Sequence, residues 1–188
     1  RRRSRNRVQP HWFASMAAGV AAARAALTAR GERLSRAAIA REIAHGLAHA
    51  HERGLVHRDV KPNNVLLPSN SDERSSLPFT PRITDFGLAH DSMAIEQKSL
   101  SARLVGTVDF MSPEQLRGDM RGVTPASDQY SLGIILYRMV TGKLPFECQD
   151  FIQLLQRINR ETPRSPRSLR ADVPRDLEAI INTCLSKQ

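Results

Sequence analysis

The sequence lacks the features that mark small secreted, metal-stabilised or membrane-spanning proteins. It has only two cysteines, Cys148 and Cys184, which lie far apart and follow no metal-ligand spacing. This usage argues against a disulfide framework or a zinc site and fits a reducing compartment. The longest apolar stretch, residues 131–140, is too short to cross a bilayer and contains Arg138. We therefore expect no membrane segment in this chain, and its 40% hydrophobic and 25% charged residues indicate a globular domain with a buried core.

Acidic residues are absent from the first 31 positions, which hold seven of the 28 lysines and arginines. The remaining 21 basic residues are nearly balanced by 19 acidic ones, so the net charge of +9 is concentrated at one end of the chain. Because the body of the domain is nearly neutral, we expect no nucleic-acid partner. Residues 1–23 are rich in Arg and Ala and stay unassigned. Since the chain starts at Arg1 and not at Met, rules for targeting peptides do not apply to them.

Hydrophobic periodicity predicts a mainly helical domain with a few short strands around a polar centre. Ser35 is expected to cap the first helix, and Gly54 to end it. Pro174 is expected to open the last helix. The expected helices span residues 35–53, 125–142, 150–158 and 174–187. The expected strands are residues 55–57, 64–67 and 82–84, with irregular segments at 68–82 and 88–104.

His45 and His49 lie one helical turn apart, as in metal-binding helices. The residue that follows His45 is Gly46, where a zinc hydrolase would need its glutamate. We therefore interpret both histidines as ordinary side chains of the helix that leads into the polar loop, in preference to metal ligands.

The polar loop "HRDVKPNN", residues 57–64, gathers the groups needed for phosphoryl transfer. Asp59 and Asn64 lie five residues apart, and Asp85 follows the next expected strand. Oxygen ligands of this type suit Mg²⁺, which favours carboxylates, water and phosphate. Lys61 adds a positive charge two residues from Asp59. Because catalysis of phosphoryl transfer consists mostly of positioning and charge neutralisation, this set of residues predicts such a site.

Four motifs in order across about 130 residues resemble the eukaryotic-like serine/threonine protein kinases, especially their bacterial (Hanks-type) members. They are "HRDVKPNN", "DFG" at 85–87, "GTVDFMSPEQ" at 106–115 and "SDQYSLGIILYRMVTGKLPF" at 127–146. The resemblance implies a mainly α (α+β), protein-kinase-like fold, with residues 24–188 forming the C-terminal large lobe. It also implies a serine/threonine kinase that uses ATP and Mg²⁺ and acts on a serine or threonine of a protein substrate.

The resemblance assigns roles to individual residues of the loop. Asp59 would accept or orient the proton of the substrate hydroxyl, and Lys61 would stabilise the transferred phosphoryl group. Asn64 and Asp85 would hold Mg²⁺ and, with Lys61, contact the nucleotide phosphates. Lys61 also favours the serine/threonine class over the tyrosine class.

Other residues would support or regulate this site. Arg58 lies where a phosphorylated activation loop can bind, and Ser99 and Ser101 occupy the places where bacterial relatives carry regulatory phosphosites. Asp128 is expected to hydrogen-bond the backbone of the catalytic loop. The remaining residues with an expected supporting role are His57, Phe86, Gly87, Thr107 and Glu114.

The chain also departs from the family pattern. It contains no G-x-G sequence and no lysine before Lys61, so the small lobe with its Gly-rich loop and ATP-binding lysine is absent. We therefore expect this chain alone to have little or no kinase activity. In similar kinases an arginine downstream of "CLSK" pairs with the glutamate of "SPE", so Glu114 is expected to lack a partner.

The alternative function is a non-catalytic, pseudokinase-like binding or regulatory module. The four intact residues Asp59, Lys61, Asn64 and Asp85 argue against it, because a lobe kept only for binding has no chemical need of them. The expected location is the cytoplasm, with a membrane anchor, if there is one, lying outside this chain.

Overall fold

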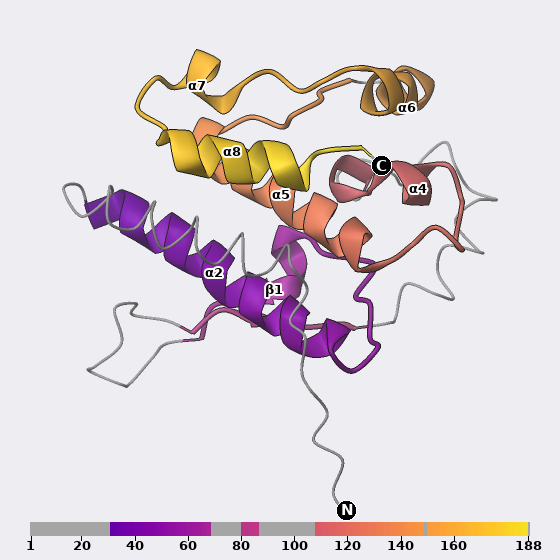
Figure 1. The fold of residues 1–188 in the computed structure, drawn as a ribbon, viewed down its shortest axis with the longest axis horizontal. Coiled ribbons are helices and arrows are strands. Elements are labelled where there is room, and N and C mark those ends of the chain that lie inside the picture. Colours follow the sequence, from indigo (N-terminus) through magenta and orange to yellow (C-terminus); the bar gives the residue numbers. More distant parts are fainter. Residues whose placement is uncertain (1–30, 69–79, 87–107, 149, 188) are drawn as a thin grey trace, which may run out of the picture.

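The computed structural model describes residues 31–68, 80–86, 108–148 and 150–187. Its architecture is mostly helical, with one short two-stranded ribbon (Figure 1), and this confirms the fold class predicted from the sequence. The elements, in order, are α2 (Gly31–His51), η1 (Pro62–Asn64), β1 (Val65–Leu66), β2 (Arg82–Ile83), η2 (Val108–Phe110), α4 (Pro113–Leu116), α5 (Pro125–Thr141), α6 (Phe151–Arg160), α7 (Pro166–Leu169) and α8 (Arg175–Cys184).

Helix α5 is the centre of the domain, and its ends are set by local sequence. The Thr124 hydroxyl accepts a hydrogen bond from the backbone N–H of Ala126, and Thr124 and Ser127 form a reciprocal capping box. Pro125 occupies the first turn, where no backbone donor is needed. Gly142 ends the helix with φ 76°, a left-handed conformation that glycine adopts without steric cost. These signals confirm the helix expected over residues 125–142.

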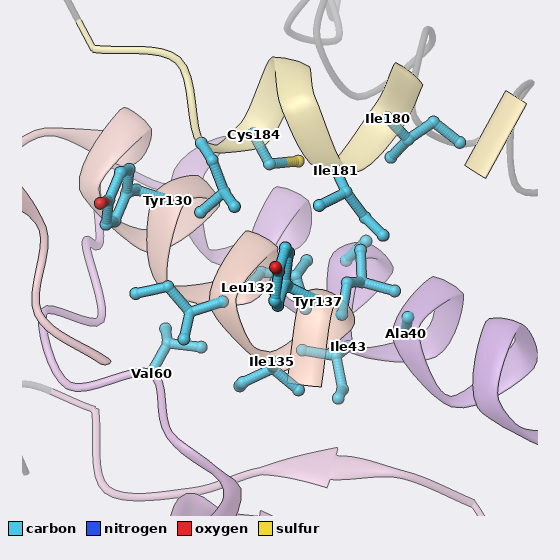
Figure 2. Packing of buried hydrophobic residues seen from close by; sticks show 14 of the residues in the cluster. Ala40, Ile43, Val60, Tyr130, Leu132, Ile135, Tyr137, Ile180, Ile181 and Cys184 are labelled. Carbon is cyan, nitrogen blue, oxygen red and sulfur yellow. The ribbon is translucent and has the colours of Figure 1, made fainter. Parts of the chain in front are cut away.

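The core forms where α5 packs between α2 and α8 (Figures 1 and 2). Leu132 and Tyr137 of α5, Leu47 of α2 and Ile181 of α8 are at most 1% exposed. Burying side chains of this size stabilises a fold by roughly 1.5–3 kcal/mol each before entropy is counted. This core includes Val60 from the polar loop (Figure 2), so the loop is anchored directly in it.

A second, smaller apolar cluster underlies α4 and α6. Phe146 and Val108 pack there with Leu154 and Ile158 of α6. Asp150 caps α6 by accepting a hydrogen bond from the backbone N–H of Gln153.

Both cysteines are packing residues. Cys184 is buried against α5, and burial raises the pKa of its thiol to about 12, so it stays protonated and unreactive. Cys148 is half-buried beside the second cluster.

Two sequence-based expectations about local structure are wrong. Ser35 lies within α2 and does not cap it, because the helix already begins at Gly31. Residues 55–57 form no strand. The backbone N–H of His57 donates to the Asp128 carboxylate and not to a neighbouring strand.

The other strand predictions are confirmed in shortened form. Val65 pairs with Ile83 and Leu66 with Arg82 in an antiparallel ribbon. Gly54 has φ 77° in the turn that follows α2, which confirms its place at the end of the helix. No helix within the described residues is long and apolar enough to cross a membrane.

The contact between α5 and α8 gives a testable prediction. A Cβ atom added at Gly133 would lie 2.6 Å from Cys184 Cβ and 3.1 Å from Leu185 Cδ2. We expect Gly133→Ala to lower the free energy of unfolding by roughly 1–3 kcal/mol, despite the higher helix propensity of alanine. Urea denaturation followed by circular dichroism measures this change.

Gly46 provides the matched control, because it lies in the interior of α2 with no atom within 4 Å of the added Cβ. Gly46→Ala should leave stability unchanged or raise it by up to about 1 kcal/mol. Equal effects of the two substitutions would contradict the close α5–α8 packing.

Candidate active site

The Asp128 carboxylate organises the polar loop from beneath. It lies in the first turn of α5, and the residue is 1% exposed. Its Oδ2 accepts hydrogen bonds from the backbone N–H of His57 at 2.8 Å and from His51 Nε2 at 2.7 Å. Its Oδ1 accepts one from the backbone N–H of Arg58 at 2.8 Å. Three donors and the positive end of the α5 dipole compensate for the burial of this anion.

Arg58 adopts a left-handed backbone conformation, with φ 69°. Such a conformation is costly for a residue with a side chain and persists only where the surroundings hold it. The Asp128 carboxylate binds the N–H of Arg58, and Gln115 Nε2 donates to its carbonyl at 2.5 Å. Gln115 is itself held by the backbone N–H of Ser112, which donates to Gln115 Oε1 at 3.0 Å. The turn at 112–115 thus fixes the loop at the residue directly before Asp59.

His57 connects the loop to the segment after β2. Its ring is fully buried, and Nδ1 accepts a hydrogen bond from the backbone N–H of Asp59 at 3.2 Å. Nε2 lies 2.8 Å from the carbonyl oxygen of Thr84, which can only accept, so Nε2 carries the proton and the ring is neutral. The ring also packs against that of Phe86, with centroids 4.5 Å apart.

Asp59, Lys61 and Asn64 lie together in the loop, with Asn64 buried and the other two partly exposed. Lys61 Nζ is 2.9 Å from Asp59 Oδ2. Asn64 Nδ2 donates to the backbone oxygen of Asp59 at 2.8 Å and to its Oδ2 at 3.0 Å. Asp59 and Lys61 side chains are 26% and 21% exposed, so the carboxylate is oriented by two donors and still reachable from solvent.

Asp85 lies near Asn64 because the preceding residue, Thr84, forms a backbone hydrogen bond with Asn64. The backbone N–H of Thr84 donates to the backbone oxygen of Asn64 at 2.9 Å. Asp85 follows with φ 64° and is exposed. One carboxylate and the oxygen of one amide, on adjacent chain segments, are a donor set that fits Mg²⁺, which takes its other ligands from water and phosphate. No group of three or more His, Cys, Asp and Glu ligands occurs within the described part of the chain.

Glu114 corrects one expectation from the sequence. It is half-buried, and it accepts a hydrogen bond from the Ser127 hydroxyl, so it has a partner although it forms no salt bridge with an arginine among the described residues. The nearby phenol of Tyr130 is buried; that burial, together with the Glu114 charge, raises its pKa above the usual range.

Four of the predicted residues lie outside the described part of the chain: Gly87, Ser99, Ser101 and Thr107. Among those described, the structure brings His57, Arg58 and Asp128 into direct contact, and likewise Asp59, Lys61 and Asn64.

Sequence analysis missed two residues that shape the site. His51, at the last position of α2, contacts Asp128, and Gln115 holds the carbonyl of Arg58. In the sequence, His51 is marked only by its position six residues before His57, and Gln115 only by its place at the end of "SPEQ".

Comparisons with known proteins show the family of this chain. The family model described as "Protein kinase domain" matches residues 22–188. A serine/threonine-protein kinase (drp72) of Corynebacterium efficiens is 39% identical over 131 residues, covering 69% of this chain and 23% of the relative. Serine/threonine-protein kinase PrkC of Bacillus subtilis is 34% identical over 150 residues, covering 79% of this chain and 21% of the relative.

A probable serine/threonine-protein kinase, PkwA of Thermomonospora curvata, is 35% identical over 179 residues, or 93% of this chain and 22% of the relative. The chain thus spans less than a quarter of the length of these curated relatives. The match over most of the sequence leads to one assignment: the chain belongs to the protein kinase family, and the three relatives described here are named as bacterial serine/threonine kinases.

Proposed function

We propose that this chain carries the catalytic loop of an enzyme that transfers the γ-phosphoryl group of ATP to a serine or threonine hydroxyl of a protein. The observation that carries the proposal is the Asp59 carboxylate, oriented by Lys61 Nζ at 2.9 Å and Asn64 Nδ2 at 3.0 Å and still open to solvent. A carboxylate held in this way can position a substrate hydroxyl and take its proton.

In the proposed reaction a bond forms between the substrate oxygen and the γ-phosphorus, and the bond from that phosphorus to the bridging oxygen of ADP breaks. Asp59 receives the proton of the hydroxyl. Lys61, beside it, neutralises charge on the transferred group. Asn64 and Asp85 would hold Mg²⁺, which supplies charge neutralisation of the nucleotide phosphates when bound.

Several observations support the roles of the surrounding residues. His57, Asp128 and Gln115 keep the loop in one shape, so that Asp59 need not reorganise during the reaction. Leu66 and Leu67 are 52% and 49% exposed beside Asn64. We propose that the nucleotide and a small lobe outside this chain cover these side chains, because large apolar groups this exposed commonly mark binding surfaces. ATP as the donor places the proposed reaction in the cytoplasm.

A phosphoryl-transfer assay with radiolabelled ATP tests the proposal. We compare this chain with a longer form that includes the native sequence preceding Arg1, and with Asp59→Asn in that longer form. We expect activity in the longer form, little in the chain alone, and a loss of about 10²- to 10⁴-fold for Asp59→Asn, because the proton acceptor is removed.

The control for this series is Asp176→Asn, an exposed carboxylate in the first turn of α8 that lies outside the loop. It should leave the rate unchanged. No activity in any folded form would contradict the proposal and favour the pseudokinase-like binding module.

Asp128 is expected to act on stability and activity together. In Asp128→Asn one acceptor oxygen is replaced by an NH₂ group that faces backbone donors, so buried hydrogen bonds are lost. We expect the free energy of unfolding to fall by about 3 kcal/mol. Urea denaturation of both carboxylate variants distinguishes the supporting role of Asp128 from the chemical role proposed for Asp59. Asp59→Asn should keep wild-type stability. A wild-type unfolding curve for Asp128→Asn would refute the supporting role of Asp128.

Regulation by phosphorylation is a further expectation of the proposed function. We propose that Ser99 or Ser101 is autophosphorylated and that Arg58, which precedes Asp59, contacts the phosphate. Mass spectrometry of the longer form after incubation with ATP and Mg²⁺ should find phosphate on one or both serines, and none on either in Asp59→Asn. An unmodified pair in the active enzyme would eliminate this role.

A further inference from the structure

A groove of about 980 Å³ lies beside the catalytic loop, between α2, β1 and the last turns of α5. Ile43 of α2, Val65 of β1 and Ile135 of α5 line its apolar part. The groove is within the size range of protein sites that bind small molecules or short chain segments. It reaches Lys61, whose Nζ is 2.9 Å from Asp59 Oδ2, so a segment bound in it lies next to the proposed proton acceptor.

The charge of the groove is strongly one-sided. Among the described residues, its lining includes four cations, Arg36, Lys61, Arg138 and Arg170, and a single acidic side chain, Asp109. A concave site lined mainly by one sign of charge concentrates ligands of the opposite sign.

Two of the four cations already have carboxylate partners. Lys61 pairs with Asp59, and Arg170 Nη2 lies 3.2 Å from Asp172 Oδ2. Their charge is therefore partly compensated within the protein.

Arg36 and Arg138 differ, because neither forms a salt bridge within the part of the chain that the structure describes. Arg36 Nη1 donates to the backbone oxygen of Met139 at 2.9 Å, a neutral acceptor that fixes the position of the guanidinium. The exposed Arg138 guanidinium lies 6.0 Å from the centre of the Phe110 ring. Arg36 is thus held at the groove by a hydrogen bond, and Arg138 lies near the Phe110 ring. Both guanidinium groups have donors that can bind carboxylates.

Asp109 is the one carboxylate among the described lining residues, and it offsets part of this charge. It is half-buried, and that burial raises the pKa of its carboxyl, an effect that Arg138 opposes and Glu147 reinforces. Asp109 and Arg138 are close enough to interact but form no salt bridge.

We propose that the groove binds an acidic segment of the protein substrate, and that Arg36 and Arg138 select its carboxylates. The inference rests on the proposed kinase function, which it deepens by naming the substrate class. A segment with glutamates or aspartates near its serine would bind the two arginines while its hydroxyl lies at Asp59.

Fluorescence anisotropy with labelled peptides tests this on the chain itself, without phosphoryl transfer. The probes are a serine peptide flanked by glutamates and the same peptide with glutamines or with lysines. We expect the glutamate peptide to bind at least about tenfold more tightly than the glutamine peptide at low ionic strength, with the difference shrinking as salt is added.

Two charge reversals locate the binding. Arg138→Glu should weaken the glutamate peptide by roughly fivefold or more and improve the lysine peptide. Arg160→Glu makes the same charge change at the exposed end of α6, outside the groove, and should have little effect. Circular dichroism shows whether Arg138→Glu disturbs the fold. If it does, Arg138→Gln takes its place. This substitution removes the charge without adding repulsion and should weaken binding of the glutamate peptide to an intermediate degree.

Three results would overturn the proposal: equal affinity for the glutamate and glutamine peptides, equal losses for Arg138→Glu and Arg160→Glu, or tighter Arg138-dependent binding of a single-stranded RNA than of the acidic peptide. Peptide binding with the expected selectivity but no phosphoryl transfer in any form would refute the kinase activity and keep the acidic docking site.

Discussion

The buried carboxylate of Asp128 is the interaction on which the rest of the site depends. It joins the start of α5 to the end of α2 through His51 and to the catalytic loop through the backbone of His57 and Arg58. A buried anion is tolerated only when its hydrogen-bonding capacity is filled, and here the donors come from the end of α2 and from the loop, which must both be correctly placed. The same hydrogen bonds therefore stabilise the buried Asp128 carboxylate and fix the backbone of the loop at His57 and Arg58. The left-handed backbone of Arg58, the residue before Asp59, is held by the hydrogen bond to Asp128.

Helices whose ends are determined by capping residues next to them in the sequence could be predicted from the sequence. For α5, Thr124 and Pro125 at one end and Gly142 at the other provide capping groups within a few residues of the helix, and the apolar run between them can only be buried. The errors occur where a distant group decides the outcome. Residues 55–57 have the composition of a strand, but the N–H of His57 is satisfied by a side chain 71 positions away. Ser35 has the chemistry of a cap, yet the helix continues through it to Gly31.

The candidate site shows the same division between local and distant information. The motif around Asp59 indicates the groups for which we propose chemical roles, because their residue types and spacing are themselves the signal. Nothing in the motif indicates that Gln115 holds the carbonyl of Arg58 or that Ser127 bonds Glu114. Glutamine and serine are common at surfaces and in turns, and their roles arise only when the 112–115 turn and α5 are brought against the loop.

The hydrogen bonds to Asp128 also dictate an order of events when the chain folds. They join residues 70 to 77 positions apart. Closing so long a loop costs conformational entropy before the stabilising contacts have formed. The local turns of α2 can form early, whereas the loop at 57–59 has no reason to take its native path until α5 has docked. During synthesis on the ribosome the catalytic loop therefore leaves the exit tunnel long before the residue that shapes it. Its final conformation is acquired late, as part of the cooperative assembly of α2 on α5.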